Sequence, residues 1–375
     1  MVESKLMGIP AVGVEANPFA HFASSVKVNW DIDPDSLVSA AQNVANAALE
    51  TLLKQGIDDN WPYTGRLDQV ALESLDDERK RLLLDGSISP LPLHKVLILL
   101  RFIRKLANQP FCDHLLLALA KTLVYSASNL HFGPEVGVKK SALKIDFPVV
   151  HQWLSAVITM AHDLRLVSAG TYPHVQVHLA DARSVDSVIE PESIDAVITS
   201  PPYPNEKDYT RTTRLESVVL GFVNSRAELR TFKKRLLRSN TRGVYNGDDD
   251  DVLVMDNSEI QIISDLIERR RIELGKTSGF ERLYAKVARL YFGGMKRHLA
   301  SLRTVLRPGA RLAYVVGDQA SYLRVMIRTG DLLAGIAEAL GYKLIRKDLF
   351  RTRFSTTTKE HLREEVIVLL WPGKG

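Results

Sequence analysis

The sequence predicts an α/β fold in which short strands alternate with helices, interrupted by one long helical segment. Short apolar runs that end in polar or acidic residues occur within the first 20 residues and again after residue 172. Helical segments lie between these runs, which indicates a mainly parallel sheet flanked by helices. Residues 31–171 show helical periodicity, broken only at glycines and prolines, and therefore predict a large helical insertion.

The elements follow in order from the N-terminus. Residues 3–8 predict a short helix, and residues 11–15 predict a buried strand that ends at Glu15 and turns at Pro18. Pro34 suits a first helical turn behind Asp33 as the cap. Further helices of the insertion are expected near residues 67–84, 92–107, 111–127 and 147–167.

The second half returns to alternating strands and helices. Strands are predicted at 174–179, 194–199 and 311–317, and helices at 214–222, 278–306 and 329–340, where Gly341 marks a helix end. Two closing strands at 342–349 and 365–370 are close in sequence and are expected to pair antiparallel at the sheet edge. The run Asp248–Asp251 is expected to form a solvated loop.

Composition excludes several classes of protein. The chain has 375 residues, of which 45% are hydrophobic and 25% charged, as in an ordinary globular protein of more than one domain. The single cysteine, Cys112, excludes a disulfide framework and is expected to be a buried core thiol. No metal site is expected, since the histidines are scattered. No membrane helix or secretory signal is evident, so a cytoplasmic location is the default expectation.

Positive charge is concentrated in the second half of the chain. Residues 301–375 hold 13 basic against 7 acidic residues. Residues 226–242 hold only one acidic residue, Glu228, and the basic side chains that we select as DNA-binding candidates: Arg226, Arg230, Lys233, Lys234, Arg235, Arg238 and Arg242. This distribution predicts that a polyanion binds in the second half, and a solvated helix face is the alternative.

The tetrapeptide Ser200-Pro201-Pro202-Tyr203 follows the strand predicted at 194–199, where open α/β sheets place their sites. An exocyclic amine of cytosine or adenine is a poor nucleophile because its lone pair is delocalised into the ring. The Ser200 hydroxyl and the Pro201 carbonyl can accept its two N–H hydrogens and free that lone pair. The prolines fix the loop, and Tyr203 offers a face for stacking an extruded base. A stiff loop without catalysis is the alternative.

This motif, together with Asp208-Tyr-Thr-Arg211 and Arg214-Leu-Glu216, resembles the amino-methylating DNA methyltransferases, the cytosine-N4 and adenine-N6 enzymes. The resemblance implies a Rossmann-like S-adenosylmethionine-dependent methyltransferase sheet and double-stranded DNA as the partner. Ser200 favours cytosine-N4 over adenine-N6 methylation. The resemblance also implies a biological setting such as restriction–modification. RNA, or a protein amide, is a weaker substrate alternative.

The resemblance further implies roles for residues outside the motif. Glu15, with Asn17 beside it, corresponds to the acid that accepts the cofactor ribose hydroxyls, and Asp181, with Ala182 beside it, to the acid that contacts the cofactor adenine. Ser200 is expected to contact the cofactor as well. Asp208, Tyr209 and Arg211 either line the site or cap the next helix, and Asp318 is expected to be a loop residue.

One feature departs from this family: the glycine-rich Phe-x-Gly-x-Gly cofactor loop is absent from the sequence. Three explanations remain open, namely a start assigned too late, a second polypeptide that supplies the loop, or loss of catalysis with retention of DNA or partner binding. The expected organisation has five parts: 1–30, an incomplete N-terminal part of the catalytic domain; 31–171, the helical insertion; 172–225, the catalytic core with the motif; 226–298, a basic insertion and candidate target-recognition region; and 299–375, the C-terminal part of the catalytic domain.

Overall fold

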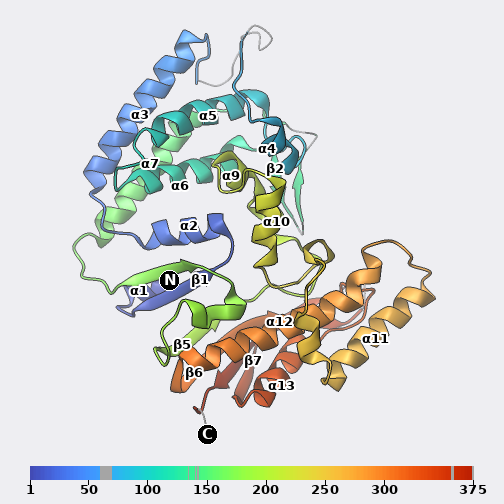
Figure 1. Ribbon diagram of the computed structural model, residues 1–375. Coiled ribbons are helices and arrows are strands. Elements are labelled where there is room, and N and C mark those ends of the chain that lie inside the picture. Colours follow the sequence, from blue (N-terminus) through green and yellow to red (C-terminus); the bar gives the residue numbers. More distant parts are fainter. Residues whose placement is uncertain (60–69, 134, 140, 142, 356–358, 374–375) are drawn as a thin grey trace. The chain divides into compact units, whose positions relative to one another are not determined.

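The computed structural model describes residues 1–59, 70–133, 135–139, 141, 143–355 and 359–373 (Figure 1). Its contacts divide the chain into two units. Unit 1 comprises Met1–Leu179 and Tyr209–Phe232, and unit 2 comprises Ala180–Asp208 and Lys233–Gly375. The two units are described separately below, and the five-part division expected from the sequence stays a prediction. In the described residues, no helix combines the length and the apolar character that crossing a membrane requires.

Unit 1 begins with helix α1 (Val2–Leu6), strand β1 (Ala11–Glu15) and helix α2 (Pro18–Val28). The strand β1 pairs in parallel with β4 (Val175–Leu179), so that Ala11 lies opposite Val175 and Glu15 opposite Leu179. Asn17 starts α2, because its Oδ1 accepts hydrogen bonds from the backbone N–H groups of the next turn. The two strands and the turn expected here are confirmed.

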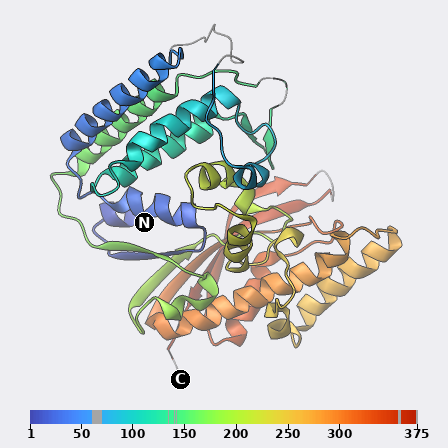
Figure 2. The same ribbon diagram turned by 45° about the horizontal axis from the view of Figure 1, so that its top comes forward.

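Within the described residues, the helical part of unit 1 is built from five α-helices and a π-helical extension: α3 (Pro34–Lys54), α4 (Asp77–Leu82), α5 (Pro90–Arg104), α6 (Cys112–Lys121), η2 (Thr122–Ala127) and α7 (Val149–Val167). Their apolar faces form a common core in which Leu37, Leu99 and Trp153 are fully buried. Helices α3 and α7 lie side by side (Figure 2). The helices expected near 92–107, 111–127 and 147–167 are confirmed, and Cys112 is buried, which raises the pKa of its thiol.

The helix expected near residues 67–84 is largely wrong. Residues 67–69 lie outside the described residues, and 70–76 form no helix. The backbone N–H of Glu73 donates instead to Nδ1 of His94, at 2.8 Å, and Asp76 starts the short helix α4 by accepting from the N–H of Arg79. A hairpin of β2 (Leu130–Phe132) and β3 (Val136–Val138), which the sequence did not predict, connects η2 to α7.

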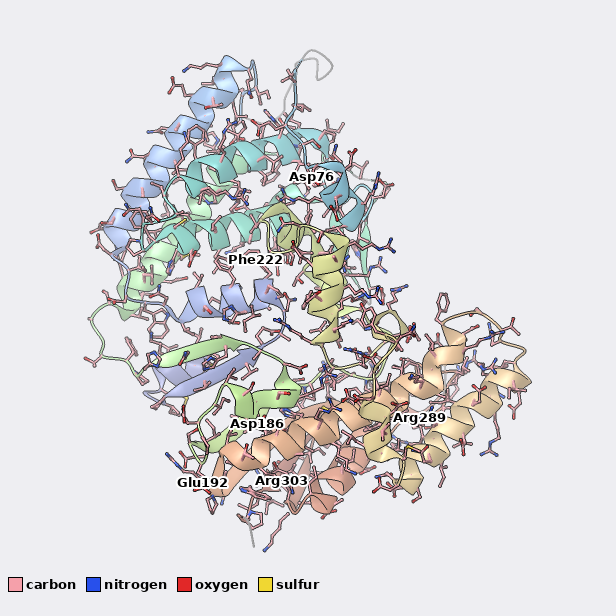
Figure 3. All side chains as sticks on the ribbon, in the orientation of Figure 1. Asp76, Asp186, Glu192, Phe222, Arg289 and Arg303 are labelled. Carbon is pink, nitrogen blue, oxygen red and sulfur yellow. The ribbon has the colours of Figure 1, made fainter. Side chains whose placement is uncertain are left out.

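The last segment of unit 1 contains α8 (Tyr209–Thr212), α9 (Arg214–Val219) and the start of α10 (Arg226–Lys234), within which the division between the units falls. Arginines of the helical part hold the end of α9: Arg79 donates to the carbonyls of Val218 and Val219. Phe222, labelled in Figure 3, packs against Phe22 of α2 with ring centroids 4.9 Å apart.

Unit 2 contains a four-stranded sheet of β5 (Ile194–Thr199), β6 (Leu306–Gly317), β8 (His361–Leu370) and β7 (Lys343–Phe354), in that spatial order. The pair β5–β6 is parallel, whereas β6–β8 and β7–β8 are antiparallel. The expected closing antiparallel pair is therefore confirmed, with β7 at the edge. The expectation of one mainly parallel sheet is corrected. The described residues form a parallel pair in unit 1 and this mixed sheet, in which β8 also runs antiparallel to β6.

Unit 2 also contains these helices: η3 (Ala182–Ser187), η4 (Thr241–Gly243), η5 (Asp250–Val254), α11 (Ser258–Glu273), η6 (Glu281–Leu283), α12 (Tyr284–Val305) and α13 (Thr329–Ala339). Helix α11, which the sequence did not predict, runs beside α12, and Arg289 of α12 donates to the hydroxyl of Ser264 (Figure 3). Arg303, near the C-terminal end of α12, donates to the carbonyl of Leu340 at 3.1 Å. These contacts join α11 and α13 to the long central helix.

Candidate active site

The Ser200–Tyr203 loop leaves the carboxyl end of β5, where Thr199 lies opposite Tyr314 of the neighbouring parallel strand. Ser200 is exposed, and its Oγ donates to the carbonyl of Val315 at 3.2 Å. That single donor is thereby used, so the hydroxyl lone pairs are left as acceptors. The two prolines restrict the backbone directly behind it. The loop therefore leaves the Ser200 lone pairs free of a described donor, and the acceptor role of Ser200 stays a prediction.

Tyr203 is held within unit 2 by a hydrogen bond to β8, and its ring lies close to the backbone at the end of β6. Its hydroxyl donates to Oε1 of Glu364 on β8 at 2.7 Å, and Oε2 of Glu364 accepts from Nε of Arg351 on β7. The hydrogen bond from Arg351 holds the pKa of Glu364 below its ordinary range, so the acceptor is an ionised carboxylate. On the other side, a Cβ at Gly317 would lie 3.1 Å from Cε2 of the Tyr203 ring. Sequence reasoning missed Glu364, Arg351 and Gly317.

The segment after the motif is bound to the chain beyond α10. The carboxylate of Glu206 accepts from both the backbone N–H and the hydroxyl of Thr241, each at 2.8 Å. Asp208 is buried and pairs with Nζ of Lys233 at 2.8 Å. In unit 1, Arg211 lies 3.5 Å from Glu135. Asp208 and Arg211 thus have structural partners, and their role in lining a site stays a prediction, as it does for Tyr209.

Glu15 and Asn17 belong to unit 1. Glu15 ends β1, its Oε1 accepts from the backbone N–H of Asn17 at 2.8 Å, and desolvation raises its pKa above the ordinary carboxyl value. The Asn17 side chain starts α2 and donates to the hydroxyl of Thr213 at 2.9 Å. A partly desolvated carboxylate at the carboxyl end of a strand suits the hydroxyls of a ribose. The Asn17 side chain fixes the turn that carries Glu15, and its role at a cofactor stays a prediction.

Asp181 and Ala182 lie in unit 2, at the start of η3. Both carboxylate oxygens of Asp181 are bound by Arg183, with Nη2 at 2.6 Å from Oδ2. The Ala182 carbonyl accepts from Nδ1 of His298 at 2.6 Å, and Nε2 of that ring contacts the Tyr314 hydroxyl at 2.8 Å. Because a carbonyl oxygen only accepts, Nδ1 carries the proton and Nε2 accepts from Tyr314. The carboxylate of Asp181 is thus paired with Arg183, and its contact with a cofactor adenine stays a prediction.

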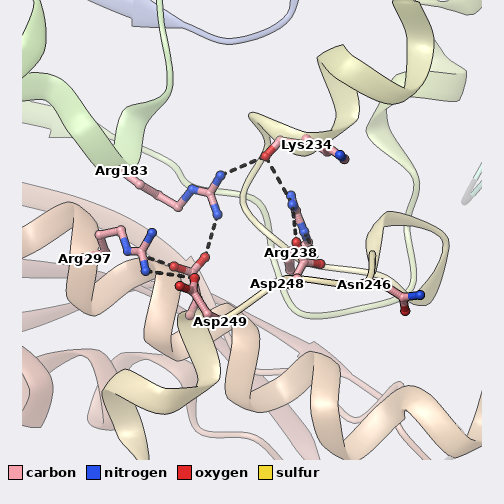
Figure 4. A pocket seen from close by; sticks show the side chains of 9 residues that line it. Arg183, Lys234, Arg238, Asn246, Asp248, Asp249 and Arg297 are labelled. Carbon is pink, nitrogen blue, oxygen red and sulfur yellow. Dashed lines mark hydrogen bonds and ion pairs between the residues drawn. The ribbon is translucent and has the colours of Figure 1, made fainter. Parts of the chain in front are cut away.

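Arg183 extends this arrangement into a polar pocket of about 210 Å³ (Figure 4). It donates to Asp250 at 2.6 Å and to the carbonyl of Lys234 at 2.9 Å, and Arg297 pairs with Asp250 at 2.9 Å. The solvated loop expected over Asp248–Asp251 is therefore wrong for Asp250, which is 2% exposed. Its charge is compensated by the two arginines, which no local pattern in the acidic run could reveal.

The basic cluster divides by burial. Arg238 is 3% exposed and pairs with Asp248 at 2.7 Å, and Lys233 pairs with Asp208, so both have structural partners. The remaining members of the cluster are exposed: Arg226 and Arg230 in unit 1, and Lys234, Arg235 and Arg242 in unit 2. DNA contact by this cluster stays a prediction. Judged by exposure, these five side chains are the candidates for that contact.

Asp318 follows β6 as the expected loop residue, but it is 2% exposed. Its Oδ2 accepts from Arg328 at 2.6 Å and from Nε of Arg363 at 2.9 Å. Arg363 also binds Asp331 at 2.8 Å and lies 3.2 Å from Glu365. These ion pairs join the end of β6 to β8 and to α13.

No protein-family model matches the chain. The type II methyltransferase M.BsoBI of Geobacillus stearothermophilus is 23% identical over 382 residues, which cover 95% of this chain and 73% of that relative. The type II methyltransferase M.AvaI, from Nostoc sp. and from Anabaena variabilis, is 28% identical over 159 residues, or 41% of this chain, and the match spans only 32% of M.AvaI.

Among solved structures, one from Thermus thermophilus, provisionally assigned as a DNA modification methylase, aligns over 52% of each chain with 15% identity and a TM-score of 0.24. The sequence relatives carry the assignment: the chain is a distant homologue of type II DNA methyltransferases.

Proposed function

We propose that this chain catalyses methyl transfer from S-adenosylmethionine to the exocyclic amine of a base extruded from duplex DNA, with cytosine-N4 as the favoured target and adenine-N6 as the alternative. The observation that carries the proposal is the loop at the carboxyl end of β5. There, a fixed hydroxyl acceptor on Ser200 adjoins two prolines and an aromatic ring held through its hydroxyl by Glu364. The distant homology to type II methyltransferases supports the same reaction.

The residues of the loop act on the base. The Ser200 hydroxyl and the Pro201 carbonyl accept the two amine hydrogens, which favours a pyramidal nitrogen with a free lone pair. Pro202 limits the freedom of the loop, and Tyr203 stacks on the extruded ring. When bound, S-adenosylmethionine supplies an electrophilic methyl group on its sulfonium. Because the acceptors lie on the rigid end of a strand, they orient the amine before it attacks.

Glu15 and Asp181 are the two acids that we propose as cofactor ligands. Glu15 is suited to the ribose hydroxyls, because burial has already removed part of its water and one oxygen is oriented by the N–H of Asn17. Asp181 would accept from the adenine amine through an oxygen that it shares with Arg183. The sequence contains no glycine-rich loop. A start assigned too late, a second polypeptide that supplies the loop, and loss of catalysis stay open as explanations.

The first test is calorimetric titration of S-adenosylmethionine, followed by transfer of its labelled methyl group to duplex DNA. Digestion to nucleosides and mass spectrometry then distinguish N4-methylcytosine from N6-methyladenine. Ser200→Ala and Tyr203→Ala should abolish transfer. Ser193→Ala is the matched control, because Ser193 immediately precedes the other end of β5 and its hydroxyl donates to the nearby Glu190 carbonyl.

The results distinguish the proposed catalytic site from a non-catalytic DNA-binding role and from another class of substrate. Full transfer by Ser200→Ala or Tyr203→Ala would refute the assigned site. DNA binding without cofactor binding would favour a non-catalytic DNA-binding subunit. Labelled RNA or peptide in place of DNA would correct the substrate class.

A further inference from the structure

The edge strand β7 is exposed and basic. Residues 343–363 contain seven Lys or Arg residues against two acidic ones, a net charge of +5. Every residue of β7 except Leu344 is exposed, including Phe350 at 66% and Phe354 at 51%. Charges on an edge strand commonly protect it from pairing with another chain. The distribution of these charges between the two faces of the β7–β8 pair decides whether they do more.

One face of this pair carries Arg351 and Arg353. Arg351 lies opposite Glu364 in the register, and Arg353 lies opposite Leu362. Residues directly opposite each other in an antiparallel pair share a face, as do residues two positions apart along a strand. The two arginines therefore share the face of Glu364, the residue that binds the Tyr203 hydroxyl.

The guanidinium groups on this face have donors available. The side chain of Arg351 is 68% exposed, and its described hydrogen bond to Glu364 uses Nε, which leaves the two terminal amino groups. Among the described carboxylates, none lies within 4.0 Å of Arg353. On the opposite face, Arg363 is already bound to Asp318, Asp331 and Glu365. Available positive charge on this part of the β7–β8 pair, which we call the ribbon, is thus concentrated on the face that carries Glu364, on the Tyr203 side.

We propose that the β7–β8 face bearing Arg351 and Arg353 binds the sugar–phosphate backbone of duplex DNA beside the base that Tyr203 stacks. This inference rests on the proposed function, and it extends DNA contact to a surface outside residues 226–242. Guanidinium groups present paired N–H donors that match phosphate oxygens. Two arginines on one face stand about 7 Å apart along a strand, so they contact separate phosphates. The polyanionic duplex supplies the complementary charge.

The test measures DNA affinity over a series of salt concentrations, with a fluorescent mixed-sequence duplex and the full chain. Arg353→Gln is the principal variant, because Arg353 makes no described hydrogen bond to Glu364; Arg351→Gln and the double variant complete the set. Arg307→Gln is the matched control, since Arg307 is an exposed, ion-paired arginine near the opposite end of β6. Each ribbon variant should weaken binding several-fold and reduce the slope of log K against log salt by about one.

The outcomes distinguish this inference from the proposed function. A double variant that binds duplex DNA with the wild-type affinity and slope overturns the assignment of DNA binding to the ribbon. Absence of duplex DNA binding by the wild type, or a preference of the wild type for duplex RNA, overturns it as well. Loss of slope in the variants without methyl transfer by the wild type supports the ribbon but refutes the proposed function. Methyl transfer by the wild type, together with wild-type DNA affinity and slope in the double variant, supports the function and refutes DNA binding by this face of the β7–β8 pair.

Discussion

The hydroxyl of Tyr203 donates a 2.7 Å hydrogen bond to Oε1 of Glu364, a residue 161 positions later in the chain. The bond fixes the far edge of the ring, while Pro201 and Pro202 restrict the backbone that carries it. Glu364 is itself held ionised by Arg351. The orientation of the ring is therefore set from both ends, as stacking on an extruded base requires.

Replacing Tyr203 by phenylalanine separates the ring from this bond. Tyr203→Phe keeps a stacking face but loses a hydrogen bond to a charged acceptor, worth about 1.5 kcal/mol, so we expect methyl transfer to fall about tenfold. Tyr203→Ala should lose far more. Initial rates of methyl transfer measure both, with Asp348→Ala as the control, because Asp348 forms an exposed pair with Arg346 in the same hairpin. An unchanged rate in Tyr203→Phe would show that the bond is dispensable.

Gly317→Ala tests the other side of the ring. The new methyl group would lie 3.1 Å from Cε2 of Tyr203 and 3.4 Å from Cζ, so the ring must shift by a few tenths of an ångström. We expect reduced methyl transfer with little loss of stability. Gly335→Ala in α13 is the control, because nothing lies within 4 Å of its added Cβ, and a helical alanine there stabilises by up to about 1 kcal/mol. Equal rates in both variants would contradict the contact.

The contacts tested by these two predictions could not be predicted from the sequence alone, although the loop itself could. The loop Ser200–Tyr203 and its place at the end of β5 were predictable, since both depend on neighbouring residues. Glu364 and Gly317 were not, because they reach Tyr203 only through pairing of strands far apart in sequence. A charged residue in an otherwise apolar strand was the available signal for Glu364.

The same limit applies to buried charges. Lys95 is fully buried in α5, where it pairs with Asp146 at 2.7 Å and lies 3.4 Å from Asp59. Periodicity alone places a lysine on a surface, and only the tertiary partners make its burial tolerable. Asp250 was misassigned to a solvated loop for the same reason.

Asp250→Ala should destabilise the chain. It removes the buried partner of Arg183 and Arg297, and leaving such charges uncompensated costs about 3–5 kcal/mol. The adjacent Asp249→Ala is the control, because its carboxylate is 71% exposed and its pair with Arg297 is worth less than about 1 kcal/mol. Urea unfolding at neutral pH measures the difference. Similar losses in the two variants would show that Asp250 is no more important than a surface acid.

Glu216 should make the stability fall as the pH rises. It is 4% exposed in α9, its Oε2 has no hydrogen-bond partner among the described residues, and it lines an apolar cavity of about 1000 Å³ in unit 1. Burial raises its pKa to about 7 from the ordinary value of 4.5. Between these values the folded state holds a proton that the unfolded state has lost, so stability declines over this range by about 3 kcal/mol in all.

Unfolding measured from pH 4.5 to 8 checks this dependence, and Glu216→Gln should remove its share of the decline, because an amide does not titrate. The exposed Glu338→Gln in α13 should leave the wild-type profile unchanged. The slope of stability against pH is the decisive quantity, because the buried amide shifts the absolute stability by its own lack of hydrogen-bond partners. Parallel profiles for wild type and Glu216→Gln would mean that Glu216 is ionised in the folded chain.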